Sequence, residues 1–187
     1  MNNFKQILNN IDVFPLLYKI SQYPELWNID DSWTKYKPDT TAIYETDNIV
    51  LRFNKSSQPG LNDWDKEAFN ILYEAQKIIF DVMRVIPGEH LGKVIITKLR
   101  PGEVIKEHID HWPVPGLPYF QRYQIPLQCA PGVIFKVENE ELYMKPVSAY
   151  WFDNQKMHSV TNNSNEDRIS MLTDIRPWKL PESNKTY

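Results

Sequence analysis

From Lys93 onward, apolar and polar residues alternate in short runs, and turn-forming residues separate most of these runs. Alternation at every second residue is typical of a strand with one buried face. Eight runs fit this description: KVIITKL, EVIKEHID, YFQRYQIPL, GVIFKVE, ELYMKP, SAYWFD, KMHSVTN and DRISMLTDI. Short strands at such regular spacing predict a β-sandwich or barrel of about eight strands.

The first ninety residues follow a different pattern, which is helical or irregular. The clearest helical pattern runs from about Asp63 to Arg84, where apolar residues recur at steps of three and four. Phe4, Ile7 and Leu8 also share a helical face, and prolines keep the predicted helical pieces of this region short. The segment Thr40–Asn54 has β-rich runs around a polar break and is interpreted as one or two strands.

The order of these patterns, helices first and strands afterwards, predicts a sheet core with helices packed outside it. A length of 187 residues suits a single domain. We expect residues 1–90 to form a helical or irregular part with one or two strands, residues 91–178 the β core, and residues 179–187 a polar tail.

Composition and charge exclude several classes of protein. Hydrophobic residues make up 42% and charged residues 24% of the chain, as in ordinary globular proteins. The net charge of −3 argues against a protein that coats nucleic acid. The single cysteine, Cys129, excludes an internal disulfide and a multi-cysteine zinc site. With no signal-like start and no apolar run long enough to span a bilayer, we expect a cytoplasmic protein without membrane contact.

Histidines and one aspartate suggest a metal site. His108 and Asp110 stand two residues apart in a predicted strand, so both side chains are expected on one face. His158 follows fifty residues after His108 in another β-like run. Two imidazoles and one carboxylate on one face of an iron leave the opposite face open, which is the ligand set of non-haem Fe(II) oxygenases. Asp153, five residues before His158, is either a partner that orients a ligand or a turn residue.

An arginine follows this ligand set at a suggestive distance. Arg168 stands ten residues after His158, behind an Asn-rich turn, so a β-turn-β passage would return it to the same cavity. Its planar guanidinium suits bidentate capture of a carboxylate. A dicarboxylate bound to a metal by one end needs such a partner at the other end. We therefore interpret Arg168 as a clamp for the far end of a co-substrate.

Residues from about Val94 to Pro177 resemble the aspartyl/asparaginyl β-hydroxylase branch of the Fe(II)/2-oxoglutarate-dependent oxygenases. Three stretches carry the resemblance: TKLRPGEVIKEHID, RYQIPL and WFDNQKMHSVTNNSNEDRISMLTDIRP. They are similar to the Leu-x-Pro-Gly strand before the first metal histidine of the family, its Arg-x-His-x-x-Leu segment, and its run from Phe-Asp through His-x-Val to Asp-Ile-x-Pro. The resemblance implies a double-stranded β-helix, a jelly-roll core of the cupin type, with the N-terminal helices outside it.

The resemblance also implies roles for individual residues. His108, Asp110 and His158 would bind Fe(II) and leave room for O₂. Four residues would contact the co-substrate 2-oxoglutarate: Arg168, Thr97, Arg122 and Gln124, the last standing where the family usually has histidine. Some members of the branch lack the metal carboxylate, whereas this chain has Asp110 and follows the commoner oxygenase pattern.

The function that the resemblance implies is a 2-oxoglutarate-dependent dioxygenase that hydroxylates an unactivated C–H bond and releases succinate and CO₂. The substrate is expected to be an amino acid, a peptide side chain or a related small molecule, and the sequence does not choose among them. Candidate substrate contacts are Arg52, Asn54, Arg100 and Trp112. The alternatives are a non-oxygenase cupin, either a metal-binding module or an isomerase, and an interaction protein that has lost activity.

Overall fold

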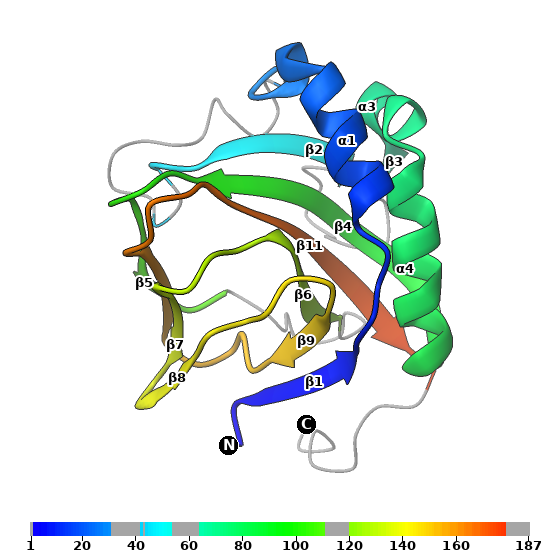
Figure 1. Cartoon of the computed structure of the whole chain (residues 1–187). Coiled ribbons are helices and arrows are strands. Elements are labelled where there is room, and N and C mark those ends of the chain that lie inside the picture. The colour runs from blue at the N-terminus through cyan, green and yellow to red at the C-terminus, as the bar shows by residue number, and fades with distance from the viewer. Residues whose placement is uncertain (1, 31–41, 43, 54–63, 111–119, 179–187) are drawn as a thin grey trace.

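The computed structural model describes residues 2–30, 42, 44–53, 64–110 and 120–178. Two antiparallel sheets face each other, and helices cover the outer face of the larger one (Figure 1). This is the jelly-roll architecture that the resemblance implied, and all eight predicted strands after Lys93 are present. No helix among these residues has the length and apolar character needed to cross a bilayer.

The larger sheet has seven strands, in the order β1-β9-β6-β11-β4-β2-β3. Their bounds are β1 Phe4–Leu8, β9 Ala149–Phe152, β6 Gln121–Gln128, β11 Arg168–Pro177, β4 Gly88–Leu99, β2 Asp47–Phe53 and β3 Trp64–Asp65. The smaller sheet has four strands, β5 Val104–His108, β10 His158–Asn162, β7 Val133–Val137 and β8 Glu140–Leu142, paired in that order. Strands from the first ninety residues therefore extend the sheet that the later strands build.

Helices form a third layer on the outer face of the larger sheet. They are α1 Phe14–Gln22, the 3-10 turn η1 Pro24–Leu26, α3 Glu67–Ile71 and α4 Glu74–Val85. Ile78, Ile79 and Val82 of α4 pack against Ile96 and Met171 of the sheet in one buried cluster. Burial of these side chains is the main force that holds the helical layer in place.

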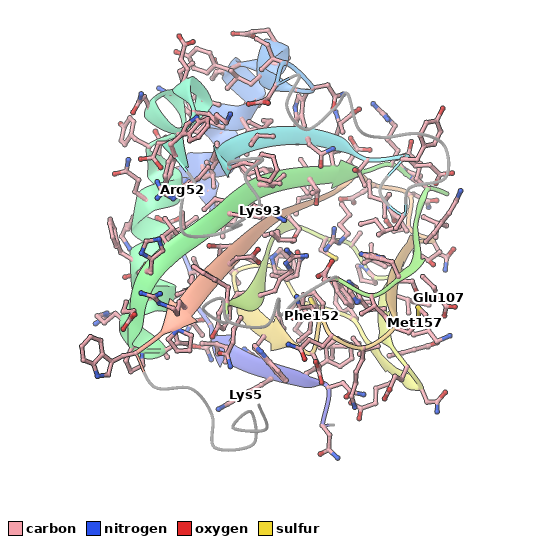
Figure 2. All side chains as sticks on the ribbon, turned by 180° about the vertical axis from the view of Figure 1, so that it is seen from behind. Lys5, Arg52, Lys93, Glu107, Phe152 and Met157 are labelled. Carbon is pink, nitrogen blue, oxygen red and sulfur yellow. The ribbon has the colours of Figure 1, made fainter. Side chains whose placement is uncertain are left out.

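A second apolar cluster fills one end of the space between the two sheets. Phe135 of β7 lies at its centre, with ring centroids 5.8 Å from Phe4 and 4.7 Å from Phe152. Figure 2, a view from behind, shows Phe152 in this inter-sheet space. The cavity of the candidate site lies beside this cluster, since Phe135 and Phe152 also line it.

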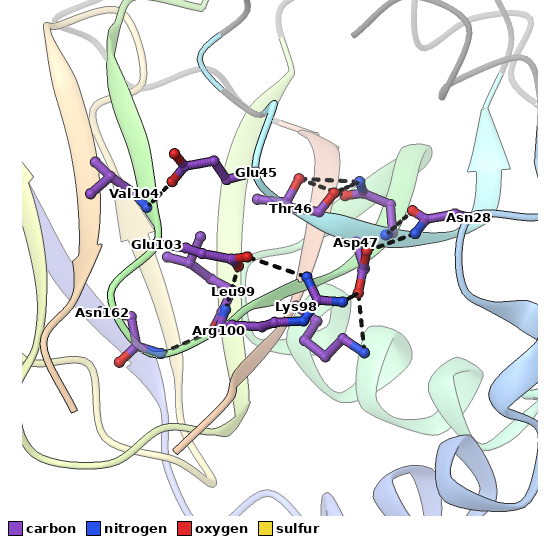
Figure 3. A network of polar contacts seen from close by, with 11 residues as sticks. Asn28, Glu45, Thr46, Asp47, Lys98, Leu99, Arg100, Glu103, Val104 and Asn162 are labelled. Atoms are coloured by element: carbon purple, nitrogen blue, oxygen red, sulfur yellow. Dashed lines mark hydrogen bonds and ion pairs between the residues drawn. The ribbon is translucent and has the colours of Figure 1, made fainter. Parts of the chain in front are cut away.

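A polar network fastens the start of β2 to the hairpin between β4 and β5 (Figure 3). The carboxylate of Asp47 accepts hydrogen bonds or ion pairs from Asn28 at 2.7 Å, Lys98 at 3.2 Å and Arg100. Burial alone would raise the pKa of Asp47, but these donors outweigh that effect and lower it. The network borders the cavity described below, because Asn48, the residue after Asp47, lines that cavity.

Two local predictions are wrong. Phe4–Leu8 is a strand, because its backbone pairs with the free edge of β9 and Phe4 enters the core between the sheets. Tertiary pairing of this kind overrides a short helical pattern. The helix expected over Asp63–Arg84 is divided: Trp64–Asp65 pairs with β2, and a turn at Leu72 and Tyr73 separates α3 from α4. An ion pair between Asp65 and Arg52 at 2.5 Å supports the strand pairing.

Candidate metal centre and cavity

Two histidines face each other on neighbouring strands of the smaller sheet. His108 ends β5 and His158 begins β10, and the two are direct cross-strand partners with ring centroids 4.2 Å apart. Nδ1 of each ring lies 2.8 Å from the backbone oxygen two residues earlier, that of Lys106 or Lys156. A carbonyl oxygen can only accept, so each Nδ1 carries a proton, and Nε2 is the ring nitrogen that remains for a metal.

Asp110 completes the group from just beyond the end of β5. Its backbone N–H donates to the carbonyl oxygen of Asn154 at 3.1 Å, which holds the chain beside the β9–β10 connection. Asp110 Oδ1 lies 3.6 Å from His108 Nε2, and Oδ2 lies 3.8 Å from His158 Nε2. One donor atom from each of the three residues lies within 4.8 Å of the others. The three side chains predicted from the sequence therefore converge.

The protonation states of two of these residues suit metal binding. Burial lowers the pKa of His158 to about 4, although the negative charge of Asp110 opposes this shift. Burial would raise the pKa of Asp110, but the positive charge of Arg122 outweighs it and the pKa falls to about 2. At neutral pH the imidazole of His158 is neutral and the carboxylate of Asp110 is ionised. These are the forms in which histidine and aspartate bind metals.

A cavity of about 440 Å³ opens beside the three residues, between the two sheets. Its apolar lining includes Ile95, Ile105, Phe135, Phe152, Val160 and Leu172. Its polar lining, apart from the three candidate ligands, includes Asn48, Lys93, Thr97, Arg122 and Gln124. A concave, mostly apolar space with a few convergent polar groups is typical of small-molecule sites.

Arg168 is buried at the start of β11 and is 2% exposed. It meets the cavity through Gln124, whose Oε1 accepts hydrogen bonds from Arg168 Nη2 at 3.3 Å and from Ser170 Oγ at 2.6 Å. Nη1 of Arg168 is buried without a hydrogen-bond partner, and Arg168 forms no ion pair with any carboxylate of the described residues. Burial lowers the pKa of this guanidinium. A buried arginine in this state is suited to an anionic ligand.

Thr97 and Arg122, the other two predicted co-substrate contacts, also lie at the cavity. Thr97 of β4 pairs across strands with Ser170 and donates from Oγ1 to the Ser170 carbonyl oxygen at 3.3 Å. Arg122 of β6 has two carboxylate partners within the chain, Asp110 and Asp174. Unlike Arg168, Arg122 therefore already has acidic partners within the protein.

Two of the candidate substrate contacts, Arg52 and Arg100, lie in the described residues, and neither lines this cavity. Arg52 is paired with Asp65 and lines a separate cavity near the helices, and Figure 2 shows it on the other side of the molecule from Met157. Arg100 is half-exposed and pairs with Asp47 and Glu103. Each of these two arginines has an acidic neighbour that the sequence pattern did not indicate. Asn54 and Trp112 lie outside the described residues.

Sequence reasoning missed several residues at the site. Asn154, rather than Asp153, contacts a candidate ligand: its Nδ2 donates to Asp110 Oδ2 at 3.1 Å. Asp153 is a turn residue, whose Oδ1 accepts from the backbone N–H of Gln155 at 3.2 Å. Asp174 and Lys93 were not singled out either. Asp174 lies two residues after Leu172 on β11, so its place on the cavity face could have been inferred from the strand period.

Comparison with known proteins agrees with this geometry. A model of the aspartyl/asparaginyl beta-hydroxylase family matches residues 32–177. The chain belongs to the aspartyl/asparaginyl beta-hydroxylase family. This membership makes the chain an enzyme of the hydroxylase class. No curated protein matches the sequence significantly.

Solved structures share the fold of this aspartyl/asparaginyl beta-hydroxylase family member at low sequence identity. A viral collagen prolyl hydroxylase from Paramecium Bursaria Chlorella virus-1, in complex with 2OG, aligns with a TM-score of 0.53 and 11% identity over 95% of this chain and 97% of that one. A Pseudomonas putida prolyl-4-hydroxylase aligns with a TM-score of 0.52 and 10% identity, over 95% of this chain and 94% of that one. A Trichoplax adhaerens prolyl hydroxylase, in complex with a hypoxia inducible factor peptide fragment, aligns with a TM-score of 0.53 and 13% identity, over 94% of this chain and 84% of that one.

The residues present in this family member fit a divalent iron and a dicarboxylate. Two imidazole nitrogens and one carboxylate form the facial donor set that suits non-haem Fe(II). The unpartnered Nη1 of Arg168 offers the positive charge that a distal carboxylate requires.

Proposed function

We propose that the chain is an Fe(II)- and 2-oxoglutarate-dependent dioxygenase that hydroxylates an unactivated C–H bond of an amino acid, a peptide side chain or a related small molecule. The observation that carries the proposal is one cavity that joins the His108, Asp110 and His158 donor set to the buried, incompletely bonded Arg168 through Gln124. Succinate and CO₂ would be the co-products.

The metal ligands would be His108 Nε2, His158 Nε2 and one oxygen of Asp110. Fe(II) bound there would supply activation of O₂ and oxidation of the C–H bond. The protein's contribution is the preparation of this donor set. The backbone carbonyls of Lys106 and Lys156 each accept from an Nδ1–H, which fixes the orientation of both rings and leaves Nε2 of each ring for the metal.

The co-substrate would be held by residues of the larger sheet. Arg168 would receive the distal carboxylate, and Thr97 and Gln124 line the cavity beside it. Binding would give the buried guanidinium the anionic partner that the described part of the chain does not provide. A charge-assisted hydrogen bond in such a site contributes about 1.5–3 kcal/mol.

The rest of the cavity would receive the reacting part of the substrate. Ile105, Phe135 and Val160 of the smaller sheet line it with apolar surface, which excludes water from the reacting group. The Trichoplax adhaerens relative is bound to a peptide fragment. A peptide side chain is therefore one of the substrate classes that the proposal retains.

An anaerobic titration separates this proposal from a cupin that binds metal without oxygenase activity. The protein is loaded with Fe(II), 2-oxoglutarate is added, and the metal-to-ligand absorption band is followed. We expect the band in the wild-type protein, its loss in His158→Ala, and succinate formation after O₂ is admitted with a pool of amino acids and peptides. Metal binding without the band would favour the non-oxygenase alternative and overturn the proposal.

A further inference from the structure

The two oxygens of Asp110 have different surroundings. Oδ2 accepts a charge-assisted hydrogen bond from Arg122 Nη1 and a hydrogen bond from Asn154 Nδ2 at 3.1 Å. Oδ1 accepts no hydrogen bond from any of the described residues and lies 3.6 Å from His108 Nε2. One oxygen is therefore held by the protein, and the other faces the donor atoms of the candidate metal site.

Asp174 on β11 holds the guanidinium of Arg122 in position. Its Nε and Nη2 donate to the two oxygens of Asp174 at 2.8 Å and 2.9 Å, which is the bidentate geometry of an arginine and a carboxylate. Arg122 and Asp174 are direct cross-strand partners on β6 and β11, in the middle of the larger sheet. The position of the guanidinium is thus set by backbone pairing and not by the metal site.

These contacts form a continuous chain from Asp174 through Arg122 to Asp110. The three side chains are 15%, 12% and 16% exposed, so water screens the ion pairs only weakly. A residue bonded in this way cannot turn without breaking several charge-assisted bonds. Each of the three guanidinium nitrogens of Arg122 already donates to a carboxylate, so two acidic side chains of the protein neutralise its charge.

We propose that Arg122 is a positioning residue that holds Asp110 as a one-oxygen metal ligand, with Asp174 fixing the guanidinium. This inference rests on the proposed metal site. It gives Arg122 a role that differs from the co-substrate contact that family resemblance implies. Arg122 acts through Asp110 and touches no reacting atom.

The test measures metal affinity directly, with no turnover. Co(II) is titrated into the metal-free protein, and the dissociation constant and the visible absorption spectrum are recorded. We expect Arg122→Gln to weaken Co(II) binding by about 10- to 100-fold, the usual effect of removing a partner that orients a ligand. Asp174→Asn, which retains Arg122 but replaces one of its ionic partners with an amide, is expected to weaken binding less.

Arg52→Gln is the matched control. Arg52 is also a partly buried arginine on the larger sheet, paired with an aspartate and with a backbone oxygen, but it lines the other cavity. Its loss should leave Co(II) affinity unchanged while it removes a comparable ion pair. Circular dichroism and thermal unfolding show whether each variant keeps its fold.

A double-mutant cycle distinguishes positioning from a general structural role. If Arg122 acts through Asp110, then Arg122→Gln has no further effect on Co(II) affinity in an Asp110→Gly background. The same cycle with Asp174→Asn serves if Arg122→Gln does not fold. Equal or tighter Co(II) binding in Arg122→Gln, or the same loss with and without Asp110, would overturn the inference. Failure of the wild-type protein to bind Co(II) would instead reject the proposed function.

Discussion

Replacement of Arg168 by methionine should have opposite effects on stability and on co-substrate binding. Methionine fills the space of the arginine stem without a charge. In the structure Arg168 is 2% exposed, has one hydrogen bond to Gln124 at 3.3 Å, and has a buried Nη1 without a partner. The native side chain therefore carries a desolvation cost that the described residues do not offset.

The magnitudes follow from these contacts. Removing an unsatisfied buried polar group raises the free energy of unfolding by about 1–3 kcal/mol, and loss of the hydrogen bond to Gln124 lowers it by roughly 1 kcal/mol. Without 2-oxoglutarate, the variant should thus unfold at the same temperature as the wild-type protein or a few degrees higher. Loss of one charge-assisted hydrogen bond to the ligand, about 1.5–3 kcal/mol, should weaken 2-oxoglutarate binding by about 10- to 150-fold.

Thermal unfolding with and without 2-oxoglutarate, together with isothermal titration calorimetry on the Mn(II) protein, measures both effects. The ligand should raise the unfolding temperature of the wild-type protein and not that of Arg168→Met. Arg176→Met, on the same strand but paired with Glu89 at 2.5 Å, is the control and should keep the wild-type affinity. A variant that is clearly less stable without ligand, yet binds 2-oxoglutarate normally, would refute the reasoning.

Three further predictions test other parts of the structure. His158→Gln should reduce the pH dependence of stability. Because burial lowers the pKa of His158 to about 4, the unfolded metal-free chain binds a proton between pH 7 and pH 5 that the folded chain does not, and the free energy of unfolding of the wild-type protein falls by on the order of 1–2 kcal/mol over this range. Urea unfolding in the presence of a chelator should show a smaller fall in the variant. Cys129 is buried and burial raises the pKa of its thiol, so iodoacetamide should alkylate it slowly in the native protein and rapidly in urea, and fast native alkylation would contradict the packing. Asn162→Ala should destabilise the fold by roughly 2–4 kcal/mol, because its fully buried amide donates to the carbonyl oxygens of Leu99 and Glu166 at 2.8 Å each. Asn163 is the exposed neighbour, and Asn163→Ala should have little effect in the same denaturation series.

The strands after Lys93 could be predicted because alternation with a period of two reports directly on a face buried between sheets. The same alternation predicted that His108 and Asp110 would share a face, and the structure brings them together although β5 ends at His108. Distance along the chain was no obstacle here, since His158 and His108 are paired by the sheet register.

What could not be predicted depends on partners chosen by the tertiary fold. The segment Phe4–Leu8 has a short pattern compatible with a helix, and only the free edge of β9 makes it a strand. Arg52 and Arg122 are both arginines in strands, and the sequence does not show that one pairs with Asp65 and the other with Asp110 and Asp174. Charge pairing across strands is a property of register, which a single sequence does not reveal for long-range strands.

The central claim is that three side chains from separate parts of the chain bind one metal beside a carboxylate site at Arg168. A crystal structure of the protein soaked with Mn(II) and 2-oxoglutarate, with the metal located by anomalous scattering, tests it most directly. We predict one strong peak at bonding distance from His108 Nε2, His158 Nε2 and an oxygen of Asp110, and the distal carboxylate of 2-oxoglutarate on Arg168. A peak elsewhere, or a ligand that leaves Arg168 unpaired, would contradict the claim.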